Sequence, residues 1–193
     1  MGVGAIVGIV FGVIVLGIII TVGIFIGIYN TLVGLRNAVK NAWSNIDVQL
    51  KRRHDLIPNL VETVKGYAAH EKQTLTDVIQ ARNVAVAAVG KGAGVQVPAE
   101  NNLSGAISRL LAVAEAYPNL RANENFIQLQ SQLAQTEDQL SLARQIYNDS
   151  VMQYNNQVQM FPSNIVAGMF HFITETFYKV EKDSDREVPV VKF

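Results

Sequence analysis

The side chains best suited to chemistry form one short cluster just before a proline. Its members are Lys51, Arg52, Arg53, His54 and Asp55. Guanidinium and ammonium groups bind phosphate and carboxylate oxygens, and a histidine can transfer protons near neutral pH. The cluster could therefore bind an anion or a lipid headgroup, or form an enzyme centre built on Arg52, Arg53 and Asp55.

The apolar pattern around the cluster favours a structural role. Leu50, Ile57 and Val64 are seven residues apart, so a helical stripe keeps its phase through Pro58. A proline inside a helix removes one hydrogen bond and crowds the carbonyl four residues earlier, at a cost of about 3 kcal/mol. The chain could restart here with Asp55 as an N-cap, but the preserved phase favours one kinked, continuous helix.

In that register Arg53 and His54 occupy the place in the stripe where an apolar residue is expected. An isolated buried charge is too costly to persist without a partner. We therefore predict a structural polar layer in which Arg53 and His54 meet an acid from another helix. Glu137 and Asp149 are the candidate acids.

Other cations could contact anions or lipid headgroups: Arg36, Lys40, Lys51 and Arg52. Lys51 lies one helical turn from both Asp47 and Asp55, so a surface ion pair is the simpler expectation. The cluster begins about 23 residues beyond the apolar N-terminal run, which is roughly 35 Å along a helix. Contact with headgroups is therefore the less favoured interpretation.

The residue requirements of familiar catalytic and metal centres are not met. The chain has no cysteine, and its three histidines, His54, His70 and His171, are far apart and outside any His-Glu-x-x-His pattern. The segment GKGAG (90–94) lacks the Gly-Lys-Ser/Thr ending of a phosphate loop. Acidic and basic residues are equal in number, 16 each, which argues against a nucleic-acid partner. We expect no catalytic residue, no metal and no cofactor.

The chain begins with an apolar run, Val3–Ile28, that contains no charge and no proline. As a helix it measures roughly 39 Å, against about 30 Å for the bilayer core. It is too long for a signal-peptide core and lacks a basic start, so a retained single-pass anchor in lipid is expected. Arg36 and Lys40 follow the run and nothing comparable precedes it, which predicts a cytoplasmic C-terminal body at the cell membrane.

Glycines in the apolar run share one side of the expected helix. They form the spacings Gly4-x-x-x-Gly8-x-x-x-Gly12 and Gly23-x-x-x-Gly27, and with Gly2 they span roughly 160° of arc, leaving Gly17 outside. Small residues at this spacing let two membrane helices approach closely. We call the five residues of these spacings the glycine face and expect it to pack against other copies in a homo-oligomer.

Amphipathic periodicity continues to the C-terminal end. Residues 29–89 form one helix or two broken near Gly66, and residues 90–98 read as a connection after which Pro98 opens another helix. A long helix follows with Asn123 as its N-cap. The last helix, 163–180, is apolar on most sides, so we expect either deep burial, which is preferred, or contact with lipid or another subunit.

The expected fold is all-α: an N-terminal transmembrane helix followed by an elongated antiparallel bundle of about four long helices. The domains are 1–28, 29–180 and a tail of 181–193, which is either disordered or a short docked strand. Tyr147-Asn148 and Tyr154-Asn155 recur at a heptad interval, as a polar docking face or, preferably, as core tyrosines with satisfied hydroxyls.

Several stretches together resemble the LemA family. They are YNTLVGLRNAVKNAWSNIDVQLKRRHDLIPNLVETVKGYAAHE (29–71), RLLAVAEAYPNLRANENFIQLQSQL (109–133), YNDSVMQYNNQVQMFP (147–162) and REVPVVKF (186–193). The resemblance implies a single-pass membrane protein with a cytoplasmic helical bundle, and it supplies no catalytic residue. We therefore expect a non-enzymatic scaffold that self-associates and organises membrane. The alternative is an adaptor or accessory module for another membrane protein, such as a membrane protease or a signalling system.

Overall fold

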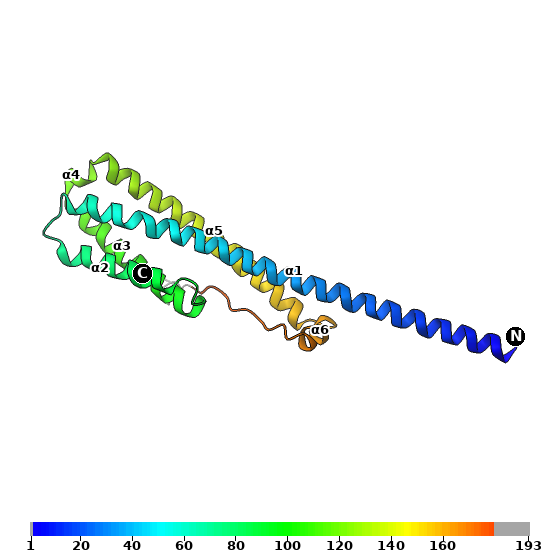
Figure 1. Ribbon diagram of the computed structural model, residues 1–193. Coiled ribbons are helices and arrows are strands. Elements are labelled where there is room, and N and C mark those ends of the chain that lie inside the picture. The colour runs from blue at the N-terminus through cyan, green and yellow to red at the C-terminus, as the bar shows by residue number, and fades with distance from the viewer. Residues whose placement is uncertain (1, 180–193) are drawn as a thin grey trace, which may run out of the picture. The chain divides into compact units, whose positions relative to one another are not determined.

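The computed structural model describes residues 2–179, except for the side chains of residues 5–7, and this part of the chain is all-helical without a strand. The helices are α1 (Val3–Lys65), α2 (Lys72–Ala88), α3 (Ala93–Ala114), α4 (Pro118–Arg121), α5 (Glu124–Gln159) and α6 (Ser163–Met169) (Figure 1). The all-α class expected from the periodicity is confirmed. The tail 181–193 lies outside the described residues.

Two compact units share these helices. Among the described residues, one unit holds 2–41 and 148–175, and the other holds 42–147 and 176–179. The second unit has a continuous apolar core from all its longer helices. Core members include Ile57, Leu60, Val64, Val78, Leu103, Leu110, Leu120 and Phe126.

Helix α1 runs for 63 residues without a break and contains Pro58, as the preserved apolar phase predicted. It ends at Lys65, and α2 begins at Lys72 after the turn at Gly66. Residues 29–89 therefore form two helices, which settles the alternative left open by the sequence.

Helix α3 begins earlier than predicted, at Ala93, so Pro98 lies inside it. The preceding connection turns at Gly90 and Gly92, whose φ angles of 78° and 85° favour glycine. Because Pro98 is close to the N-terminus, its missing N–H leaves only the carbonyl of Gly94 without a helical partner. The fully buried Gln96 fixes this end through its side-chain amide, which donates to Asp47 Oδ1 at 2.9 Å.

Helix α5 has the predicted N-cap, because the Asn123 side-chain oxygen accepts a hydrogen bond from the Phe126 amide at 3.0 Å. At its other end the chain turns into α6, which stops at Met169 rather than continuing to residue 180. His171 adopts φ 55°, and the Phe172 amide donates to the Ala167 carbonyl at 2.9 Å. This left-handed closure is a Schellman motif, with histidine where glycine is usual.

The chain beyond α6 is extended rather than helical. In the first unit, the Asn155 side chain accepts from the Glu175 amide and donates to the Glu175 carbonyl, both at 2.8 Å. In the second unit, the Tyr147 hydroxyl donates to the Thr176 carbonyl at 2.9 Å. The Tyr-Asn pairs on α5 thus combine the two roles considered for them: Tyr147 is buried with a satisfied hydroxyl, and Asn155 holds the C-terminal segment.

Candidate functional site

Three helices of the second unit bring their polar side chains together in its interior. Arg53 Nη2 donates to Ser104 Oγ at 2.6 Å, and Arg53 Nη1 lies 3.8 Å from Glu100 Oε2 and 3.4 Å from Glu137 Oε2. His54 Nε2 is 2.8 Å from Glu100 Oε1. These five residues, from α1, α3 and α5, form what we call the buried charge cluster.

Burial differs sharply between the two acids. The Glu100 side chain is fully buried and that of Arg53 is 5% exposed, whereas 48% of Glu137 is exposed. Charges held at such depth persist only with partners that replace water. Arg53 meets this requirement in part: its Nη2 hydrogen-bonds the Ser104 hydroxyl, whereas its buried Nη1 faces the two carboxylates as ion pairs without a hydrogen bond.

The cluster includes Glu137, one of the two acids considered from the sequence. The other expectation was wrong: Asp149 is exposed, and Arg53 meets Glu100 instead. Twelve residues separate Asp149 from Glu137, which turns the two side chains roughly 120° apart on a helix. Glu100 was missed although it lies three and seven residues before Leu103 and Ile107, on the buried stripe of α3.

Another missed contact explains how the proline is tolerated inside α1. Pro58 has no N–H for the carbonyl of His54, four residues earlier. Arg82 of α2 supplies the donor, with its Nε 2.9 Å from that carbonyl oxygen. A guanidinium from a neighbouring helix therefore satisfies the one backbone acceptor that the proline orphans.

Ser104, His54 and Glu100 are the residue types of a hydrolytic triad, but their connections differ from one. A triad serine donates to the histidine that acts as its base. Here the Ser104 hydroxyl donates to the Glu100 backbone carbonyl at 3.0 Å and accepts from Arg53. The geometry is that of a structural polar layer. Among the described residues, no group of three or more His, Cys, Asp or Glu side chains could hold a metal ion.

Beside the cluster, α1 and α2 border a surface groove of about 500 Å³ that is lined in part by Asp47, Lys51, Asp55 and Arg82. Lys51 Nζ lies 2.6 Å from Asp55 Oδ2, and this hydrogen bond holds the pKa of Asp55 below its ordinary value. The ion pair neutralises Lys51, Arg82 donates to the His54 carbonyl, and Arg52 is exposed on the surface. These contacts give little support to an anion site here.

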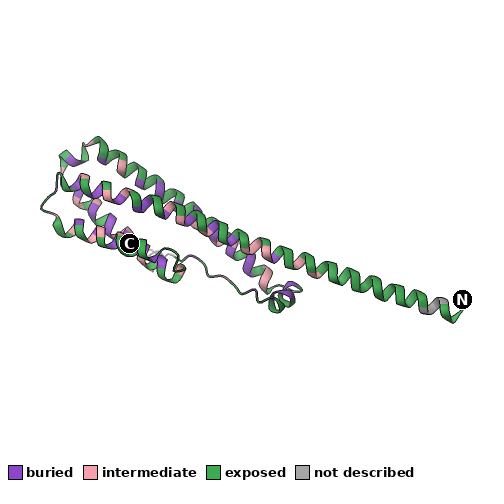
Figure 2. Cartoon of the chain, viewed as in Figure 1, coloured by how far each residue is buried: buried purple, intermediate pink, exposed green. Residues whose placement is uncertain are grey.

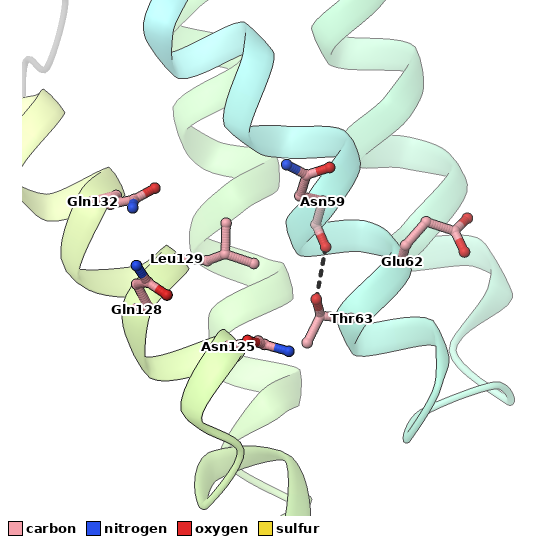
Figure 3. Close-up of a pocket in the computed structure, with 7 residues that line it drawn as sticks. All are labelled: Asn59, Glu62, Thr63, Asn125, Gln128, Leu129 and Gln132. Atoms are coloured by element: carbon pink, nitrogen blue, oxygen red, sulfur yellow. Dashed lines mark hydrogen bonds between the residues drawn. The ribbon is translucent and has the colours of Figure 1, made fainter.

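A second groove, of about 410 Å³, lies between α1 and α5 (Figure 3). Amide and hydroxyl groups from Asn59, Thr63, Asn125, Gln128 and Gln132 line it. The Thr63 hydroxyl donates to the Asn59 carbonyl within the same helix, at 2.8 Å. Such a surface can form hydrogen bonds with a partner, and the acid in its lining, Glu62, is paired with Lys65 at 3.1 Å.

In the first unit, the apolar run at the start of α1 is exposed over nearly all its described residues (Figure 2). Helix α1 is long and apolar enough to cross a membrane, with a mean hydropathy of 3.1 in its most apolar window. A Cβ added at Gly4, Gly8, Gly12, Gly23 or Gly27 would meet no atom within 4 Å. The glycine face is therefore open to an approaching helix.

Arg36 and Lys40 follow this run in different surroundings. The Arg36 guanidinium carbon lies 4.9 Å from the centre of the Phe172 ring, so this cation packs on an aromatic face of its own unit. Lys40 is exposed. Of the two side chains, Lys40 is the more exposed.

The sequence profile of the LemA family matches residues 42–193, most of the chain and all of its charge cluster. The chain belongs to the LemA family. Protein LemA of Metamycoplasma hominis is 28% identical over 140 residues, which cover 72% of this chain and 63% of that relative. Magnetosome protein MamQ 2 of Paramagnetospirillum magneticum is 24% identical over 183 residues, covering 82% of this chain and 67% of the relative. MamQ of Magnetospirillum gryphiswaldense is 23% identical over the same shares.

The family membership that the four quoted stretches indicated is thus confirmed. In this LemA-family chain the buried charge cluster joins helices that are far apart in the sequence, and the apolar run stands outside the matched region. The two features therefore call for separate functional interpretations.

Proposed function

We propose that this LemA-family protein is a membrane-anchored, non-enzymatic scaffold that self-associates through the glycine face of α1. The observation that carries the proposal is the exposure of an apolar, glycine-faced segment that continues without a break into a packed helix. Exposed apolar surface of this extent needs lipid or another protein to cover it. The buried charge cluster then serves to fix the order of the helices in the bundle.

The direction of the glycine face supports the proposal. At about 100° per residue, the glycine face is centred roughly 180° from Leu32 and Val39, the first two fully packed residues of α1. Phe25 and Ile28, which are partly buried, lie on the same side as Leu32. From Phe25 onward the protein's own helices therefore cover only the side of α1 opposite to the direction in which the glycines point, and the glycine face stays free for a second copy.

Membrane insertion gives the glycines their effect. Lipid tails are as apolar as the helix itself, so association in a bilayer depends on close van der Waals contact, which small residues permit. Three relatives are named for the magnetosome, and organisation of a membrane is the part of the proposal that draws on them. A single pass with the bundle on the cytoplasmic side follows from Arg36 and Lys40 after the run.

The test compares glycine substitutions on two sides of one helix in the full-length chain. Gly12→Leu, and more strongly Gly4→Leu with Gly8→Leu and Gly12→Leu, should reduce the oligomer size measured by light scattering and crosslinking in mild detergent. Gly17→Leu is the matched control, because Gly17 lies outside the glycine arc and also has no neighbouring atom within 4 Å. An oligomer of unchanged size, or equal loss in the control, would refute packing through this face.

A further inference from the structure

Large apolar side chains are exposed at the end of α5 and along α6. They are Met160, Phe161, Ile165, Met169, Phe170 and Ile173, and we call them the apolar patch. Phe161 is 79% exposed and Ile173 75%. Six such residues within one short segment are unusual for a surface that faces water.

Hydrogen bonds and buried side chains hold the segment that carries the patch. Ser163 is buried, and its hydroxyl lies 2.6 Å from the Gln157 carbonyl oxygen and 2.8 Å from that of Met160. The buried side chains of Val166 and Ala167 attach α6 to its unit, and the Schellman motif closes the helix. The deep burial preferred for this helix from the sequence is therefore wrong. Helix α6 is too short to bury more than one of its sides. The patch is displayed by an ordered turn.

Aromatic contacts place this turn beside α1 at the end of the apolar run. Tyr29, the residue after Ile28, has its ring centre 4.8 Å from that of Phe170 and 5.8 Å from that of Phe172. Two turns further along α1, the Arg36 guanidinium carbon lies 4.9 Å from the centre of the Phe172 ring. Figure 1 shows α6 next to the part of α1 where these residues lie.

The start of α1 and the segment that carries the apolar patch both lack charged residues. Residues 150–174 contain no Asp, Glu, Lys or Arg, and α1 carries none before Arg36. The contact between Arg36 and Phe172 therefore brings the first charge of one segment next to the end of the uncharged stretch of the other. This shared boundary between uncharged and charged surface is what a membrane interface requires of two adjacent segments.

We propose that the apolar patch is a second membrane contact, inserted into the interfacial layer of the leaflet in which the apolar run ends. The inference rests on the proposed function, because it takes that run as the membrane span. Phenylalanine and methionine side chains at this depth bury apolar area among headgroups and upper acyl chains, about 5–10 Å into the interface. Two contacts with one leaflet would fix the direction in which the first unit meets the bilayer.

The test uses depth-dependent fluorescence quenching in the full-length chain. The chain has no cysteine, so single substitutions carry one environment-sensitive label each. Phe161→Cys reports on the patch, Ile19→Cys on the span, and Asn41→Cys on an exposed position roughly 20 Å past Ile28 along α1. Each labelled protein is reconstituted into phosphatidylcholine vesicles with nitroxide-labelled lipids.

Shallow nitroxides should quench the label at residue 161 by about twofold, with little quenching at residue 41. Quenching at residue 19 by deep nitroxides, without quenching at 161, would overturn the patch inference and leave the anchor intact. Absence of quenching at residue 19 would instead refute the proposed span. A blue shift at 161 that lipid nitroxides leave unquenched, and that disappears as the protein is diluted in lipid, would mean that a second copy covers the patch, which also overturns the inference.

Discussion

The buried charge cluster allows one prediction to be worked through from burial alone. Glu100 and Glu137 both face Nη1 of Arg53, but Glu137 is closer, at 3.4 Å against 3.8 Å. If distance decided the energy, Glu137 would matter more. Water screens a half-exposed pair, however, so such pairs contribute about 0–1 kcal/mol.

Removing the charge of Glu100 has a larger expected effect. A buried pair that loses one partner destabilises a protein by about 3–5 kcal/mol, because the remaining charge stays buried. Glu137 and Ser104 still contact Arg53, so Glu100→Gln should cost about 3 kcal/mol, at the low end. For a chain of this size that lowers Tm by roughly 6–12 °C, whereas Glu137→Gln, which loses half-exposed pairs with both Arg53 and Arg144, should lower it by less.

The assay is thermal and urea unfolding of the full-length variants in mild detergent, followed by circular dichroism at the helical minimum. The two substitutions are chemically identical, so each serves as the control for the other. A loss of stability in Glu137→Gln equal to or larger than that in Glu100→Gln would refute the reasoning from burial.

Two further predictions concern the C-terminal segment and the pH range of stability. Asn155→Ala removes both hydrogen bonds to the Glu175 backbone and should cost about 1–3 kcal/mol, with faster amide hydrogen exchange at Glu175 while the α5 N-cap at Asn123 keeps its protection. Burial raises the pKa of Tyr178 above its ordinary 10.0, against the opposing charge of Arg144. The unfolded chain therefore loses this proton first, and stability should fall as pH rises above 10. Tyr178→Phe should reduce that fall between pH 9 and 11 in urea unfolding; an identical pH dependence in both proteins would contradict it.

The features found from the sequence are those that local periodicity determines. The phase of Leu50, Ile57 and Val64 was enough to carry α1 through Pro58 and to turn Arg53 and His54 inward. The N-cap of α5 followed from one residue type at a boundary. Family membership followed from residue patterns that run over much of the chain.

The features missed depend on partners distant in the sequence. Glu100 is buried because α1 places a cation and a histidine against it, and the predicted start of α3 at Pro98 left this acid in an uncertain first turn. The His54 carbonyl could have accepted a hydrogen bond from any nearby donor, so nothing in the sequence identified Arg82 as that donor. The extended segment after α6 depends on His171 in a conformation usually given to glycine and on the Asn155 amide.

The unbroken course of α1 from Val3 to Lys65 limits which changes of length this chain can accept between Gly27 and Leu32. One inserted residue would turn everything before it by about 100° relative to the part of α1 that follows, while seven would return it to within roughly 20°. A flexible hinge would have made such insertions harmless. In this stretch, substitutions should therefore be tolerated better than single-residue insertions or deletions, because the helix transmits any rotation from one end to the other.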